Sequence, residues 1–288
     1  MINTRAGGIA ISSTRRISLC AFVRFVAVFG FLLGVLSPPG ACAALDPGLD
    51  AAIRATLAKG PGTITTTDLL ELVSLNAGDL GIVSLSGIQP ATNIASLDLR
   101  YNLVSDPSPL QTLTQMSVLG MRGNPLTNLQ AIAALTNLTW LDLSRDLGTD
   151  FVSDVSSLAS LPHLSTFMLA GCGYTNVTPF KLLRSVHTLF LQNNSISSLV
   201  DIYGLTNVDT LYLSGNQVQD AGPLTNLPRL ASLQLDRNLC TNAAFLASLA
   251  NLTNISLANN LLSNFSAPAR LTNAAYLNLS HNFLTNVS

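Results

Sequence analysis

Apolar side chains recur at a fixed interval along most of this chain. From Leu72 onward the pattern LxxLxLxxNxL returns every 22 residues, and a single repeat is four residues longer. Its first apolar position, numbered 0 below, is occupied in successive repeats by Leu72, Ile94, Met116, Leu138, Leu164, Val186, Val208, Leu230, Leu252 and Ala274. A constant period of this length predicts a stack of about ten similar units, each with one strand and one return segment.

The positions within each repeat predict which residues form each element. Positions 3 and 5 are apolar, so they alternate with positions 2, 4 and 6 as the two faces of a strand do. Apolar residues at positions 13, 16 and 19 have the three-residue spacing of a short helical or 3-10 segment. In the repeat that starts at Val186, Leu189 and Leu191 belong to the strand, and Leu199 and Ile202 belong to the return segment.

The period and the pattern together are those of leucine-rich repeats. We therefore predict an α/β solenoid, a right-handed leucine-rich-repeat horseshoe with a helical N-terminal cap. Its parallel β-sheet would lie on the concave face, and the helical or 3-10 return segments would lie on the convex face. Residues 72–288 would hold about ten repeats, the last of them incomplete.

Position 8 of the repeat is asparagine in most units. The residues are Asn102, Asn124, Asn194, Asn216, Asn238, Asn260 and Asn282. A side-chain amide both donates and accepts hydrogen bonds, so it can satisfy backbone groups of adjacent coils in a buried turn. We interpret this column as structural and not as a binding site.

Residues 44–71 do not fit the repeat and predict a helical cap. Leu49, Ala52 and Ile53 have helical spacing after Pro47, a residue that suits the first turn of a helix. A second short turn is expected over residues 67–71, with a threonine or aspartate as its N-cap. Such an end unit would cover the apolar stacking face of the first repeat.

Two features interrupt the repeat. The four extra residues follow Leu143 and predict a bulge at the exit of that strand, which we interpret as a tolerated loop, with a role in binding as the alternative. The last unit reaches Ser288 without a return segment, so Leu277 and Leu279 would lack a neighbour on one side. The sequence is then a fragment, or further residues or a partner cover this edge, for example through end-to-end association.

The N-terminal 43 residues have the order of a secretory signal peptide. Basic residues come first, then an uncharged and mostly apolar run from Phe25 to Leu36, then the small triplet Ala41-Cys42-Ala43. We expect cleavage after Ala43 and no membrane insertion of the mature chain, which would be secreted or held at the cell surface. An uncleaved anchor starting near Ile17 and a lipid-modified Cys42 are the alternatives.

Charge excludes one class of partner. Charged residues make up 10% of the chain. Four of its 14 Lys and Arg precede Ala44, which leaves ten bases against 15 acids and a net charge of −5 beyond that point. A nucleic-acid surface needs a basic stripe, so we predict that this protein does not bind nucleic acid.

The two cysteines of the mature chain should not pair. Cys172 occupies position 8 of its repeat, and Cys240 lies three repeats later. Adjacent strands are about 4.8 Å apart, so the two residues would be separated by roughly 14 Å or more. A disulfide requires Cα atoms within about 7 Å. We therefore interpret both cysteines as small buried side chains.

Patterns associated with catalysis or cofactors are missing from the sequence. His163, His187 and His281 lie in different repeats, with no Cys or acid at metal-ligand spacing. There is no phosphate-binding loop, nucleophile elbow or paired carboxylate arrangement. We predict a protein that is not an enzyme and that uses no cofactor and no metal.

The outward positions of the sheet suggest a binding surface. Positions 2 and 4 place one group of large side chains on adjacent strands, and polar residues including Arg145, Gln192, Asp236 and Arg237 surround it. The candidate partner-binding residues are Trp140, Asp142, Met168, Phe190, Tyr212 and Gln234. Aromatic anchors ringed by polar groups are typical of protein interfaces. Cross-strand stacking that merely stabilises the sheet is the alternative interpretation.

Residues 45–288 resemble bacterial secreted leucine-rich-repeat proteins of the internalin type. The resemblance is carried by Leu49, Ala52, Ile53 and Leu57 in the cap, and by the junction from Leu85 to Leu99, LSGIQPATNIASLDL. It implies a repeat domain used for recognition, secreted or attached to a surface, and often followed by further domains and an anchor.

The sequence therefore favours a noncatalytic recognition or adhesion module that binds a protein partner of unknown identity through the concave sheet. The first alternative is a structural spacer, or a fragment of a larger multidomain surface protein. The second is an intracellular repeat protein that regulates an enzyme, which a mature N-terminus at Ala44 would exclude.

Overall fold

The computed structural model describes residues 44–145 and 154–287, which belong to one compact unit. The expected signal peptide, residues 1–43, lies outside the described residues, as do most of the residues inserted after Leu143. In the described part of the chain, no helix is both long and apolar enough to cross a bilayer.

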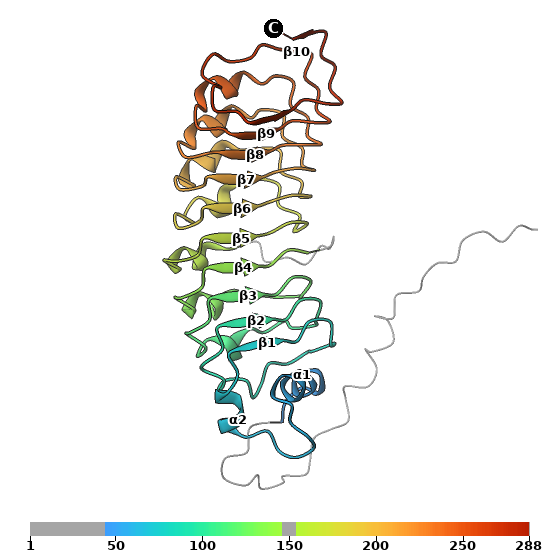
Figure 1. The fold of residues 1–288 in the computed structure, drawn as a ribbon, viewed down its shortest axis with the longest axis vertical. Helices are drawn as coiled ribbons and strands as arrows, with labels where there is room; N and C mark the ends of the chain where they lie inside the picture. Colours follow the sequence, from blue (N-terminus) through green and yellow to red (C-terminus); the bar gives the residue numbers. More distant parts are fainter. Residues whose placement is uncertain (1–43, 146–153, 288) are drawn as a thin grey trace, which may run out of the picture. The chain divides into compact units, whose positions relative to one another are not determined.

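Ten parallel strands form the main sheet, in the order in which they occur along the chain (Figure 1). They are β1 (Ser74–Asn76), β2 (Ser96–Asp98), β3 (Val118–Gly120), β4 (Trp140–Asp142), β5 (Thr166–Met168), β6 (Thr188–Phe190), β7 (Thr210–Tyr212), β8 (Ser232–Gln234), β9 (Asn254–Ser256) and β11 (Tyr276–Asn278). Every strand occupies positions 2 to 4 of its repeat, so the predicted leucine-rich-repeat solenoid and its strand positions are confirmed.

The register between strands follows the sequence period. Thr188 pairs with Thr210, 22 residues later, and the same step joins the other neighbours. The exception is Trp140, which pairs with Thr166 across a step of 26 residues. The four extra residues are therefore accommodated between β4 and β5 without shifting the sheet.

Short 3-10 helices follow the strands from β2 to β8, as the three-residue spacing predicts. They are η3 (Ser108–Leu110), η4 (Ile132–Ala134), η5 (Ser156–Ser160), η6 (Thr178–Phe180), η7 (Val200–Gly204), η8 (Gly222–Asn226) and η9 (Ala244–Ser248). The coil after β9 differs, because β10 (Asn264–Phe265) pairs there with β12 (Asn286–Val287) in a two-stranded sheet. This pairing is not expected from the repeat.

The core is a column of aliphatic side chains between the sheet and the return segments. Leu189, Leu211 and Leu233 lie in register at position 3 of adjacent strands, and each is 0% exposed. Burial of apolar surface between one coil and the next is the main force that holds such a stack together. At the last coil the predicted exposure of an inward residue is confirmed, since Leu277 is 37% exposed. End-to-end association through this edge stays a prediction.

Two helices precede β1. The first, α1 (Pro47–Leu57), begins at Asp46, whose carboxylate accepts the N–H of Gly48, and it buries Leu49, Ala52 and Ile53. This is the helix that the apolar spacing predicts.

The second helix, α2 (Thr66–Leu70), has a capping box between Thr65 and Asp68. The expected N-cap was a threonine or aspartate at the start of residues 67–71, so the helix begins earlier than predicted. Thr65 is the cap because its hydroxyl accepts the N–H of Asp68, whose carboxylate in turn accepts the N–H of Thr65. The Lys59 ammonium and this contact with Thr65 hold the pKa of Asp68 at about 2.

The asparagine column connects each coil to the one before it. The side-chain oxygen of Asn216 accepts the N–H of Ile196 at 3.0 Å. Its amide donates to the carbonyl oxygens of Leu191 at 2.9 Å and Leu213 at 2.8 Å. The equivalent bonds recur at Asn102, Asn124, Asn194, Asn238, Asn260 and Asn282. The structural interpretation of the column is confirmed.

Both cysteines are free and buried, as expected. Cys172 takes the place of an asparagine, and its thiol donates to the carbonyl of Leu143. Burial raises the pKa of Cys172 to about 12 and that of Cys240 to about 11, so neither is a reactive thiol at neutral pH.

Removing one asparagine of the column should destabilise the whole stack. In Asn216→Ala the buried N–H of Ile196 loses its acceptor and two carbonyls lose their donor. Each buried group left unpaired costs about 1–3 kcal/mol. Urea unfolding should show this loss, whereas Asn207→Ala should change stability little, because the side chain of Asn207 donates to the carbonyl of Arg184 at the surface. Equal stability of the two variants would contradict the structural role of the column.

Candidate functional site

The sheet face is the surface formed by the outward side chains at positions 2, 4 and 6. Met168, Phe190, Tyr212 and Gln234 occupy position 4 of β5 to β8 and are paired in that order. The first three are half-buried, and Gln234 is exposed. Trp140, also half-buried, starts β4 and lies in register with Thr166 of β5. We call Met168, Phe190 and Tyr212 the aromatic strip, although its first member is a thioether.

The two rings of the strip are stacked on one another. The centroids of Phe190 and Tyr212 are 4.4 Å apart and their planes differ by 7°. Each ring therefore covers one face of the other, and the outer faces point along the row toward Met168 and Gln234. The strip presents ring edges outward, and no broad aromatic plane. This is the contact that the sheet-stabilising interpretation requires, and it also fixes both rings for contact with a partner.

Asp142 differs from the sequence-based expectation. We predicted an outward polar residue at the border of the site, but Asp142 is only 5% exposed. Its carboxylate turns back at the strand exit and accepts the backbone N–H of Ser144 at 2.9 Å. Its role in the structure is to satisfy that backbone group, which leaves little of it available for contact with a partner.

The chain resembles leucine-rich-repeat proteins in both sequence and structure. A family model described as leucine-rich repeats in two copies matches residues 184–226. Internalin C2 of Listeria monocytogenes is 31% identical, with a TM-score of 0.54 over 84% of this chain and 93% of that one. The chain is an internalin-like leucine-rich-repeat protein.

Two further solved structures share the fold of this internalin-like protein. The functional domain of InlJ from Listeria monocytogenes, described as including a cysteine ladder, is 24% identical with a TM-score of 0.64. That match covers 83% of this chain and 51% of the other. An internalin, inlF, from the same organism is 22% identical with a TM-score of 0.51, over 84% of this chain and 95% of that one. No curated protein sequence matches the chain.

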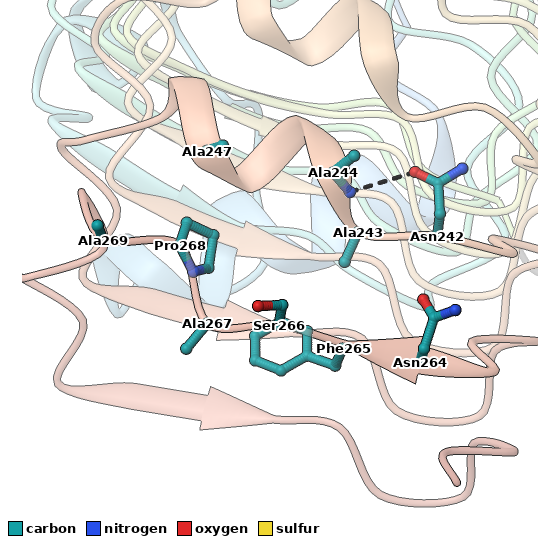
Figure 2. Close-up of a pocket in the computed structure, with 10 residues that line it drawn as sticks. All are labelled: Asn242, Ala243, Ala244, Ala247, Asn264, Phe265, Ser266, Ala267, Pro268 and Ala269. Atoms are coloured by element: carbon teal, nitrogen blue, oxygen red, sulfur yellow. Dashed lines mark hydrogen bonds between the residues drawn. The ribbon is translucent and has the colours of Figure 1, made fainter. Parts of the chain in front are cut away.

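Away from the sheet face, the internalin-like protein has a cavity of about 490 Å³ beside η9. Figure 2 shows its lining, which consists of Asn242, Ala243, Ala244, Ala247, Asn264, Phe265, Ser266, Ala267, Pro268 and Ala269. The side chain of Asn242 already accepts the N–H of Ala244. None of these residues is titratable, so the cavity offers no acid, base or strong nucleophile. Among the described residues there is also no cluster of three or more His, Cys, Asp or Glu that could hold a metal ion.

Charged groups that the sequence analysis did not assign to the site lie on the sheet face nearer its N-terminal end, at β2 and β3. Asp98 and Arg100, at positions 4 and 6, form an ion pair of 2.6 Å on the sheet face, and this pair lowers the pKa of Asp98. Arg122 lies over the ring of Tyr101, 5.7 Å from its centroid. The arginines at position 6 of two successive repeats were the sequence signal for these contacts.

The exposed strip and the buried column beneath it should respond differently to truncation. Leu211→Ala removes a fully buried side chain and should cost about 2–5 kcal/mol of unfolding free energy. Phe190→Ala removes one ring of an outward stack, which is worth about 0.5–1.5 kcal/mol. Chemical denaturation of both variants checks the difference. A loss in Phe190→Ala as large as that in Leu211→Ala would mean that Phe190 belongs to the core.

Proposed function

We propose that this internalin-like protein is a noncatalytic recognition or adhesion module that binds a protein partner through its sheet face. The observation that supports this most is the aromatic strip with Trp140, which places large, partly exposed side chains in the middle of the sheet. Half of the other outward positions are Ser, Thr or Asn. Protein interfaces concentrate their binding energy in such clusters of large side chains.

The rigidity of the strip supports the same proposal. Phe190 and Tyr212 hold each other in place before any partner arrives, because their rings are parallel and in contact. Ordering flexible side chains is a large part of the cost of association, and a pre-ordered surface avoids it. A repeat solenoid also offers an extended surface, and in these proteins the concave sheet is suited to that use.

Polar groups lie on the sheet face on both sides of the strip along the solenoid. Gln234 lies beside Tyr212 on the adjacent strand and is exposed. The ion pair of Asp98 and Arg100 lies toward the N-terminal end of the sheet. A polar border around an apolar centre is the usual composition of a protein interface.

We further propose that the protein acts after export, as a chain that begins at Ala44. The support is the order of basic, apolar and small residues over positions 1–43. In the mature chain, residues 44–71 would serve as the cap and residues 72–288 as the repeat region.

Partner capture by variants of the full mature chain tests the proposal. Phe190→Ala and Tyr212→Ala should each reduce recovery of the bound protein at least tenfold, because a central interface side chain typically contributes 2 kcal/mol or more. Tyr203→Ala is the matched control, since Tyr203 is a 54% exposed tyrosine on the 3-10 helix η7. Full capture by the strip variants, or loss with Tyr203→Ala alone, would place the interface elsewhere.

A further inference from the structure

The backbone N–H at position 6 of each repeat points to the sheet face. In six coils it donates to a side-chain oxygen there: Gly78 to Asn76, Arg100 to Asp98, Ser144 to Asp142, Ala170 to Ser144, Ala258 to Asp236, and Ser280 to Asn278. These acceptors come from position 4 of the same coil or from position 6 of the coil before. In each of these coils a side chain of the same coil or of the coil before therefore pairs this donor.

In three successive coils this donor is not paired. Among the described residues, the N–H groups of Gln192, Ser214 and Asp236 have no hydrogen-bond partner. Position 4 of these coils is Phe190, Tyr212 or Gln234, and the first two have replaced the Asp or Asn that accepts elsewhere. The substitutions that create the aromatic strip thus also leave neighbouring donors unpaired.

The backbone of these three coils has the same orientation as in the others. Each unpaired N–H lies in the same peptide plane as the carbonyl of position 5. The carbonyls of Leu191, Leu213 and Leu235 accept side-chain N–H groups of the asparagine column, as the carbonyl of Leu99 does in a coil with an acceptor. The unpaired N–H groups consequently point the same way as the N–H of Arg100, toward the sheet face.

Two side chains at the same place are also unsatisfied. The side-chain oxygens of Gln192 and Ser214 are buried and have no hydrogen-bond partner among the described residues. Buried polar atoms without partners are rare in folded proteins, and each needs a partner such as a water, an ion or a ligand group. Three donors in a row and two unpaired oxygens therefore lie together at the exits of β6, β7 and β8.

We infer that this donor row binds a carboxylate of the protein partner, carried by an Asp or Glu side chain whose neighbours contact the aromatic strip. The inference deepens the proposed function and depends on the sheet face being the partner surface. A carboxylate only accepts hydrogen bonds and has two oxygens, so it bridges two neighbouring N–H groups about 4.8 Å apart. Rows of backbone N–H groups are known anion-binding features.

The surrounding charges agree with a carboxylate ligand. The carboxylate of Asp236 is already engaged by the hydroxyl of Ser256 and the N–H of Ala258. Arg237, the next residue in the chain, is exposed and carries a positive charge. Hydrogen bonds from N–H groups to an ionised oxygen are stronger than those to a neutral one, which favours a carboxylate over an amide.

Titration of the ¹⁵N-labelled full chain with N-acetylglutamate amide, followed by NMR, tests the inference. The amide signals of Gln192, Ser214 and Asp236 should move downfield and saturate together. The signals of Arg100 and Ala258, whose N–H groups are already paired, should stay in place. The neutral probe N-acetylglutamine amide should produce shifts at least fivefold smaller at the same concentration.

The variant Ala170→Ser sharpens this test. Its hydroxyl would accept the N–H of Gln192, as the hydroxyl of Ser144 accepts the N–H of Ala170. The response of Gln192 should then be lost while that of Ser214 and Asp236 remains, and Ala170→Val, which adds no acceptor, should leave all three responses intact.

Three results would overturn the inference: no saturable shift at the three donors, equal shifts with both probes, or equal shifts at the paired amides. Because the probe is not the partner, failure here is separate from failure of the capture experiment with Tyr212→Ala. Shifts at the donor row with unchanged capture by Tyr212→Ala would refute the proposed function while leaving the carboxylate site intact.

Discussion

The bonds of the asparagine column hold successive coils of this protein in register. Each asparagine side chain joins the turn of one coil to the carbonyl of the coil before it, as Asn216 joins Leu191 and Ile196. The turn is buried, so its backbone groups have no access to water and need these partners. Since the column fixes which residues of adjacent coils lie side by side, it also fixes which side chains meet on the sheet face. The alignment of Phe190 with Tyr212 follows from it.

The sheet face shows how residues suited to binding can occupy outward positions of the repeat. A short polar residue at position 4, such as Asp98 or Asn278, accepts a backbone N–H of its own coil. Phe190 and Tyr212 give up that bond and stack on each other instead. The strip therefore gains apolar contact area and rigidity at the cost of local hydrogen bonding. A recognition surface at this place uses both consequences, the fixed rings and the free donors.

The repeat made most of the fold predictable. A long period is a nonlocal signal, because each unit must stack on the next, so the strand positions, the 3-10 segments and the burial of Cys172 and Cys240 all followed from the register. The sequence also placed Phe190 and Tyr212 side by side on an outward face. These features depend only on the period and on the alternation of strand positions.

Features that depend on side-chain choice were not predictable in the same way. Thr65 caps α2 because its hydroxyl accepts the N–H of Asp68, a contact that several nearby residues could have made. Asp142 is buried although its position in the repeat faces outward, and its carboxylate accepts the N–H of Ser144. The pairing of β10 with β12 extends a contact that another pair of coils makes only as an isolated bridge, between Asn176 and Ser198. These outcomes depend on local contacts that the apolar pattern does not encode.

Thiol labelling of the native protein tests the alternation on which the account depends. Cys172 and Cys240 are buried, so the chain that begins at Ala44 should react slowly with a maleimide and give a clean baseline. Tyr212→Cys should then be labelled within minutes, while Leu211→Cys should be labelled only after denaturation. Rapid labelling at position 211 with protection at position 212 would contradict the register, and with it the sheet face and its proposed function.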